Sequence, residues 1–119
     1  MNPEQQRVAI AKACGWTAQK DIERFWRAVD ASGNMTHELW VSESNVWAAG
    51  IPNFLNDLNA MHEAEKVLPH QLSHIDYWQK GYGRFQTLLA ELTITPYSAT
   101  ASQRAEAFLR TIGKWEEAK

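Results

Sequence analysis

Apolar residues recur at helical spacing in three separate segments of this 119-residue chain. The first segment begins after Asn2, which can cap a helix, and Pro3 suits the first helical position. The second occupies residues 53–68, and the third begins with a T-x-x-Q capping box of Thr100 and Gln103. Because an amphipathic helix is stable only when its apolar side is buried, we predict that the three helices pack together. The three apolar stripes are Val8, Ala11 and Cys14; Phe54, Leu58, Met61 and Leu68; and Ala105, Phe108, Leu109, Ile112 and Trp115.

The stretch between the first two helices carries weaker patterns. Helical spacing of its apolar residues predicts a helix at residues 18–31, ended by Gly33 and Asn34. Residues that favour β structure predict a small hairpin with strands at 36–41 and 45–48. The apolar residues of the predicted 18–31 helix are Ile22, Phe25, Trp26 and Val29.

A longer helical pattern follows Pro69 and extends to Leu92. Gly81 and Gly83 each weaken this pattern by about 1 kcal/mol relative to alanine, so a kink, two helices or a turn between two strands are alternatives. Residues 93–100 predict an extended connection. The whole pattern indicates a single compact domain, residues 1–119, that is mainly α (α+β), with four or five helices and a small β-hairpin or short strands.

Composition places the chain among ordinary globular proteins, with 45% apolar and 22% charged residues. Cys14 is the only cysteine, so no internal disulfide can form and a reducing compartment is expected. No apolar run is long enough for a signal peptide or a membrane span. We therefore expect a cytoplasmic protein that does not bind membranes.

The acidic residues are concentrated in the middle of the chain. Residues 28–65 contain six acidic residues and no lysine or arginine, whereas the net charge of the whole chain is −2. This distribution gives no general attraction to nucleic-acid phosphates. It predicts either a solvated acidic face or a surface that meets a basic partner.

Two sets of residues are the candidate binding sites, and they differ in charge. The first is an acidic face on the 53–68 helix that would meet a protein partner. The second is a basic and aromatic group on the last helix that would hold a small anionic, nucleotide-type ligand. The predicted partner-binding residues are Asp57, His62, Glu63 and Glu65. The predicted ligand-binding residues are Arg104, Arg110, Lys114 and Trp115.

Motifs for catalysis or for a metal are lacking in the sequence. His62 and Glu65 share a helical face, but a metal site needs further converging ligands, and the spacing is not that of an HExxH motif. His70 and His74 have a compatible spacing without a third ligand. There is no G-x-S-x-G turn and no glycine-rich phosphate loop. We expect a non-enzymatic protein without a metal or cofactor, and a small metal-dependent hydrolase using His62 and Glu65 is the enzymatic alternative.

Three segments of the chain resemble a known family: IAKACGW, IPNFLNDLNAMHEAEKVL and ATASQRAEAFLRTIGKWEE. The family comprises small phage and prophage proteins of unknown function that resemble the phage ABA-sandwich domain. The resemblance covers residues 9–16, 51–68 and 99–117. It implies a phage or prophage product in a bacterial host cytoplasm and supplies no chemistry. A full α/β/α sandwich would need more strands than this sequence predicts.

The expected function follows from this context and from the lack of catalytic motifs. We expect a phage or prophage accessory protein that binds a host component and inhibits a host defence system through protein binding. Sequestration of a small nucleotide-type ligand is the alternative, and self-association into a homo-oligomer would bury any apolar surface left open.

Overall fold

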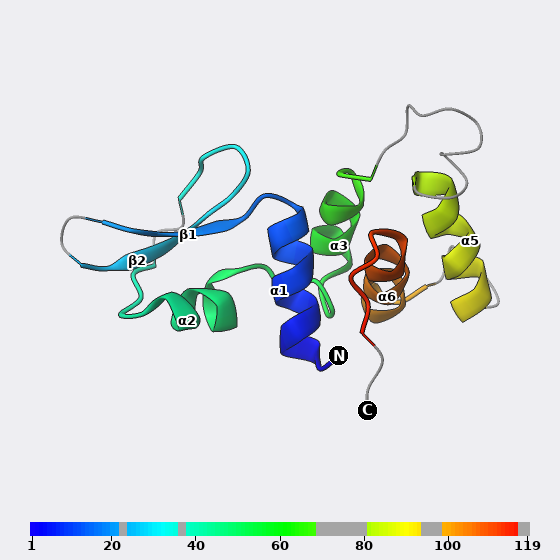
Figure 1. Ribbon diagram of the computed structural model, residues 1–119, viewed down its shortest axis with the longest axis horizontal. Coiled ribbons are helices and arrows are strands. Elements are labelled where there is room, and N and C mark those ends of the chain that lie inside the picture. Colours follow the sequence, from blue (N-terminus) through cyan, green and yellow to red (C-terminus); the bar gives the residue numbers. More distant parts are fainter. Residues whose placement is uncertain (22–23, 36–37, 69–80, 94–98, 117–119) are drawn as a thin grey trace.

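A computed structural model describes residues 1–21, 24–35, 38–68, 81–93 and 99–116. Figure 1 shows a β-hairpin at one end of the molecule, α5 at the other, and α1, α3 and α6 between them. The longer helices are α1 (Pro3–Ala13), α3 (Leu58–Glu65), α5 (Tyr82–Leu92) and α6 (Ala101–Thr111). The remaining elements are β1 (Thr17–Lys20), β2 (Trp26–Val29), the short helix α2 (Glu43–Asn45) and the π-helical turn η1 (Val46–Gly50). The prediction of a mainly α (α+β) domain with a small hairpin is confirmed.

The helical core is built around α6. Its residues Phe108 and Leu109 are fully buried, and α6 packs against α1, α3 and α5. Ile10 of α1, Met61 of α3 and Phe85 of α5 are also fully buried in the same cluster. The predicted packing of the three amphipathic helices is confirmed except for Leu58, which is 44% exposed at the start of α3, and α5 joins them.

Two capping boxes fix where α1 and α6 begin. In α1, Asn2 accepts a hydrogen bond from the Gln5 amide at 2.7 Å, and the Gln5 side chain accepts one from the Asn2 amide at 2.9 Å. In α6, Thr100 and Gln103 form the same reciprocal pair, as their spacing predicts. Gly15, at φ +88°, ends α1 in the left-handed conformation that glycine tolerates.

The predicted helix at residues 18–31 is wrong, because this segment forms the antiparallel hairpin of β1 and β2. Asp21 starts the connecting turn by accepting a hydrogen bond from the Phe25 amide, and Arg24 adopts φ +72°. Trp26 then exchanges two backbone hydrogen bonds with Trp40, at 2.8 and 2.9 Å. Backbone hydrogen bonds to neighbouring segments therefore form along both edges of β2. These pairings, rather than the helical spacing of its side chains, decide the structure of this segment.

The predicted hairpin with strands at 36–41 and 45–48 is also wrong. Ser42 caps a short helical segment by accepting from the Asn45 amide, and α2 and η1 together occupy residues 43–50. Of the predicted first strand, Trp40 pairs with β2 rather than with residues 45–48. The structure therefore contains a hairpin, but β1 and β2 form it, and both precede the residues for which it was predicted.

The two middle helices are shorter than their sequence patterns. α3 begins at Leu58 rather than near Asn53, because Asp57 is the residue that caps it. α5 begins after Gly81, so its residues confirm the second half of the helix predicted from Pro69 onward. Residues 69–80 of that prediction, and 94–98 of the predicted extended connection, lie outside the described residues. Within the described chain, no helix is long and apolar enough to span a lipid bilayer.

The close approach of α1's end to the hairpin gives a test of this arrangement. A Cβ on Gly15 would lie 2.8 Å from the Ala31 Cβ, in addition to the strain of a left-handed conformation. We expect Gly15→Ala to lower the free energy of unfolding by about 2–4 kcal/mol in urea denaturation. Gly113→Ala is the matched control, because Gly113 has φ +74° and open space around it. Equal losses in the two variants would contradict the close contact.

Candidate functional site

Two of the predicted site residues form a buried ion pair with each other. Glu65 is the last residue of α3 and Arg104 lies in the first turns of α6, and they are 4% and 8% exposed. Arg104 Nε lies 2.9 Å from Glu65 Oε2, and Nη2 lies 2.6 Å from Oε1. The guanidinium carbon also lies 5.6 Å from the centre of the Phe85 ring. The hydrogen bond to Glu65 raises the pKa of Arg104, so the guanidinium stays charged.

The predicted exposed positions of these two residues are therefore wrong. Glu65 does not belong to an acidic face, and Arg104 does not face a ligand from the polar side of α6. A signal was present in the sequence, because an acid at a helix C-terminus and a base near an N-terminus both oppose the helix dipole. Such placements indicate that each charge has a partner elsewhere in the fold.

The remaining predicted partner-binding residues lie on the outside of α3. Asp57 accepts hydrogen bonds from the Asn59 and Ala60 amides at 3.0 and 3.2 Å, so it caps the helix. His62 and Glu63 are exposed, and Glu63 forms an exposed ion pair with Lys66 at 2.7 Å. An exposed pair of this kind contributes about 1 kcal/mol or less, so Glu63 can exchange Lys66 for another cation.

The outer side of α3 borders a pocket of about 340 Å³ that reaches the base of the hairpin. We call it the acidic pocket, because Asp30 and Glu63 are the two charged residues among those that line it. Trp16, Phe54 and Val67 contribute apolar wall. The complete lining is Cys14, Trp16, Asp30, Ala31, Ser32, Pro52, Phe54, Ala60, Glu63, Ala64 and Val67.

The two carboxylates are held by different parts of the fold. Asp30 follows β2, and its Oδ1 accepts hydrogen bonds from the Ser32 and Asn34 amides at 2.9 and 3.0 Å. Glu63 projects from α3, which ends in the buried pair. The pocket therefore lies at a junction between the hairpin and the helical core, with one acid from each.

Cys14, the third ionisable residue of the lining, is neutral at physiological pH. Burial raises the pKa of its thiol from 9.0 to about 11. Its Sγ lies 3.8 Å from the carbonyl oxygen of Ala64, which is compatible with a weak S–H donor. The charge of the pocket wall thus comes from the two carboxylates.

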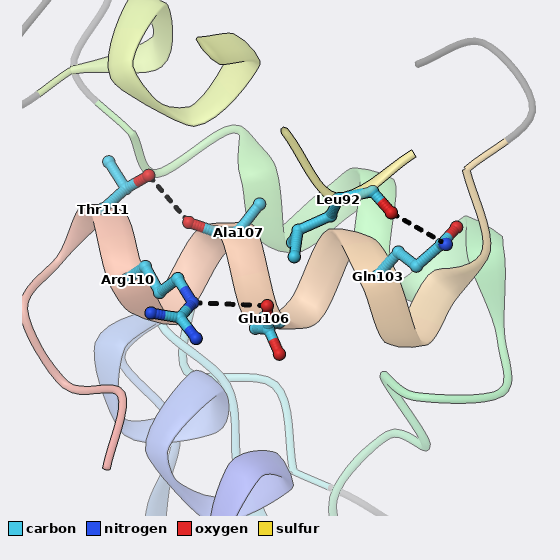
Figure 2. Close-up of polar contacts among 6 residues, drawn as sticks. All are labelled: Leu92, Gln103, Glu106, Ala107, Arg110 and Thr111. Atoms are coloured by element: carbon cyan, nitrogen blue, oxygen red, sulfur yellow. Dashed lines mark hydrogen bonds and ion pairs between the residues drawn. The ribbon is translucent and has the colours of Figure 1, made fainter. Parts of the chain in front are cut away.

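The predicted ligand-binding residues separate into three locations. Arg104 is in the core, as described above. Lys114 is exposed and lines a different groove, of about 640 Å³, beside α1. Arg110 and Trp115 do lie together, with the guanidinium carbon 5.1 Å from the indole ring. Figure 2 shows Arg110 also paired with Glu106, at 3.2 Å, as their i, i+4 spacing predicts.

The geometry does not support the metal-dependent alternative based on His62 and Glu65, because the Glu65 carboxylate is held by Arg104. Among the described residues, no group of three histidine, cysteine or acidic side chains is arranged to hold a metal. His70 and His74 lie outside the described part of the chain.

Comparisons with known proteins add no named relative: no family model, curated protein or solved structure matches this chain.

The buried pair predicts a strong contrast between two arginines of the same helix. Arg104→Met should lower the free energy of unfolding by about 3–5 kcal/mol, because it leaves the Glu65 carboxylate buried without its partner. Arg110→Met should cost about 1 kcal/mol or less, since Arg110 is exposed. Chemical denaturation followed by circular dichroism measures both.

The double variant Glu65→Leu/Arg104→Met separates charge from shape. It removes both buried charges, so we expect it to recover most of the stability lost in Arg104→Met. A double variant as unstable as the single one would show that packing of the arginine, rather than pairing, is what matters.

The raised pKa of Cys14 predicts slow alkylation. With a pKa of about 11, about one thiol in 1,000 is ionised at pH 8, against about one in ten at the ordinary value of 9.0. Iodoacetamide should therefore react about 100-fold more slowly with the folded protein than with the urea-unfolded chain. The folded state holds this proton to higher pH, so the group also reduces stability as pH rises from 9.0 towards about 11. Equal alkylation rates would show an exposed thiol.

Proposed function

We propose that this chain is a non-enzymatic binding protein that holds a basic protein partner at the acidic pocket. The observation that carries the proposal is the composition of the pocket: two carboxylates, from two parts of the fold, above an apolar wall. Residues 28–65 contain no lysine or arginine, and the Lys66 side chain that pairs with Glu63 is exposed, so a partner's cation can displace it. Charge complementarity of this kind selects the partner and speeds association.

An arginine or lysine side chain fits the chemistry of this pocket. Its aliphatic part can lie along Phe54 and Val67, while its charged end meets Asp30 and Glu63. Trp16 is half-buried in the same wall, and an indole ring favours a cation over its face. Arginine suits the site best, because its planar group can bind a carboxylate and stack on an aromatic ring at once.

The hairpin and the segment that follows it enlarge the surface on which a partner can dock. Four apolar side chains are exposed there, with Met35 at 58% and Val41 at 76%. Exposed apolar residues on the same hairpin that carries Asp30 favour a partner-binding surface over a purely solvated one. The exposed apolar residues are Phe25, Met35, Leu39 and Val41.

The biological setting is proposed from the family resemblance. A phage or prophage accessory protein in a bacterial cytoplasm would meet host proteins, and inhibition of a host defence protein through binding is the role we propose. The acidic pocket supplies a physical basis for such binding, because it selects a partner with an exposed arginine or lysine.

The pocket can be tested with a charge-matched peptide pair. The ¹⁵N-labelled protein is titrated with an arginine peptide and with the same peptide carrying citrulline, which keeps the shape without the charge. We expect the arginine peptide alone to shift the Trp16 indole and Val67 amide signals, and added salt to weaken binding. The double variant Asp30→Asn/Glu63→Gln should bind about tenfold more weakly.

The variants are chosen to leave the fold intact. The amide introduced by Asp30→Asn retains an oxygen that accepts the two loop hydrogen bonds, and Glu63→Gln removes only an exposed ion pair. Glu91→Gln is the control, since Glu91 is an exposed acid on α5 outside the pocket. Equal binding of both peptides, or unchanged binding in the double variant, would refute the role of the carboxylates. A host protein captured by the wild type and not by the double variant would then identify the partner.

A further inference from the structure

A second pocket, of opposite charge, lies between α5 and the end of α6. It has a volume of about 300 Å³ and is lined by Arg84, Leu88, Arg110, Gly113 and Trp115. We call it the basic pocket. It shares no lining residue with the acidic pocket, so its function is a separate question from partner binding.

The antiparallel arrangement of α5 and α6 brings the two arginines together. Gln103 at the start of α6 donates to the Leu92 carbonyl at the end of α5, at 3.4 Å, as Figure 2 shows. The start of α5, with Arg84, therefore lies beside the end of α6, with Arg110. Leu88 lies one turn beyond Arg84 on the same face of α5, and because it is 6% exposed it forms an apolar floor.

Arg110 is held in place on two sides. Its Nε lies 3.2 Å from Glu106 Oε2, and its guanidinium carbon lies 5.1 Å from the Trp115 ring. A guanidinium that is already oriented loses little side-chain freedom when it binds an anion. Gly113 adds no side chain to the pocket, and even a Cβ at this position would meet nothing within 4 Å.

Among the described residues that line the basic pocket, the charged side chains are both arginines. Glu106 offsets one of the two guanidinium groups, and Arg84 forms no ion pair with any described residue. α6 also ends here, and its C-terminal carbonyls account for a preference for one cation. Arg84 therefore leaves a positive charge at the pocket that a bound anion can neutralise.

We propose that the basic pocket binds the phosphate group of a small phosphorylated molecule of about mononucleotide size. Paired guanidinium groups match the oxygens of a phosphate, to which each can donate more than one charge-assisted hydrogen bond. A volume of about 300 Å³ lies at the lower end for ligand pockets, which favours a small ligand over a dinucleotide. Leu88 and Trp115 provide apolar contact for the remainder of the ligand.

The residues of this site differ from those that sequence reasoning selects. Arg84 is a new member, and Arg104 and Lys114 are excluded because one is buried with Glu65 and the other lines another groove. This difference gives a specific test, because Lys114 is close to the site in sequence but not part of its lining.

The test measures binding of three probes to the full-length protein by isothermal titration calorimetry: AMP, ribose 5-phosphate and adenosine. We expect AMP and ribose 5-phosphate to bind and adenosine not to bind, because the phosphate supplies the main contact. Arg84→Gln and Arg110→Gln should each weaken AMP binding by about tenfold or more, since each removes charge-assisted hydrogen bonds. Arg110→Lys should also weaken it, because an ammonium group lacks the planar fork.

Lys114→Gln is the matched control and should bind AMP as the wild type does. Circular dichroism and thermal melting confirm that each variant is folded, as expected for changes of partly exposed side chains. The proposal is overturned if neither phosphorylated probe binds, if adenosine binds as well as AMP, or if binding survives in both arginine variants. Loss of binding in Lys114→Gln alone would place the phosphate in the groove beside α1 instead. None of these outcomes depends on the acidic pocket, so the two proposals are tested independently.

Discussion

The buried pair of Glu65 and Arg104 is the interaction on which the helical core depends. It joins the end of α3 to the beginning of α6, and the Phe85 ring of α5 lies against the guanidinium. Both charges are buried, so each would carry a large desolvation cost without the other. Two parallel hydrogen bonds between the guanidinium and the carboxylate form in only one relative orientation of the two groups. The pair thereby fixes how α3 and α6 align, beyond what apolar contacts alone would specify.

This pairing also changes how the acidic middle of the chain should be understood. Its six carboxylates are not equivalent: Glu65 is neutralised in the core, and Asp57 caps α3. Glu63 has an exposed and exchangeable partner, and Asp30 retains one carboxylate oxygen beyond its loop hydrogen bonds. The charge that can act on a partner is therefore smaller than the sequence total, and Asp30 and Glu63 are the two of these residues that line the acidic pocket.

Local signals predicted α1, α5 and α6, whereas the helix expected at residues 18–31 was wrong because long-range pairings form a hairpin there. Capping by Asn2, Thr100 and Asp57 involves residues two or three positions apart, and such contacts can be recognised in sequence, although sequence reasoning assigns Asp57 to a binding face. The hairpin depends on Trp26 pairing with Trp40, 14 positions away, which no local pattern indicates. The residues of the basic pocket show the same limit, because contacts within one helix end can be predicted from sequence and contacts between helices cannot. Arg110 and Trp115 were found because they share one helix end, whereas Arg84 joins them only through the antiparallel packing of α5 on α6.

The position of the acidic pocket links partner binding to the stability of the hairpin. A two-stranded hairpin is marginally stable alone, and here its edge is supported by isolated bridges at Met35 and Trp40 and by contact with η1. Asp30 belongs to this less stable part, while Glu63 belongs to the helical core. On the proposed function, a partner's cation held by both carboxylates would stabilise the docked position of the hairpin relative to any displaced one by mass action. The hairpin in turn holds Asp30 in place for binding. On the proposed function, recognition at this junction would be cooperative with docking of the hairpin on the helical core.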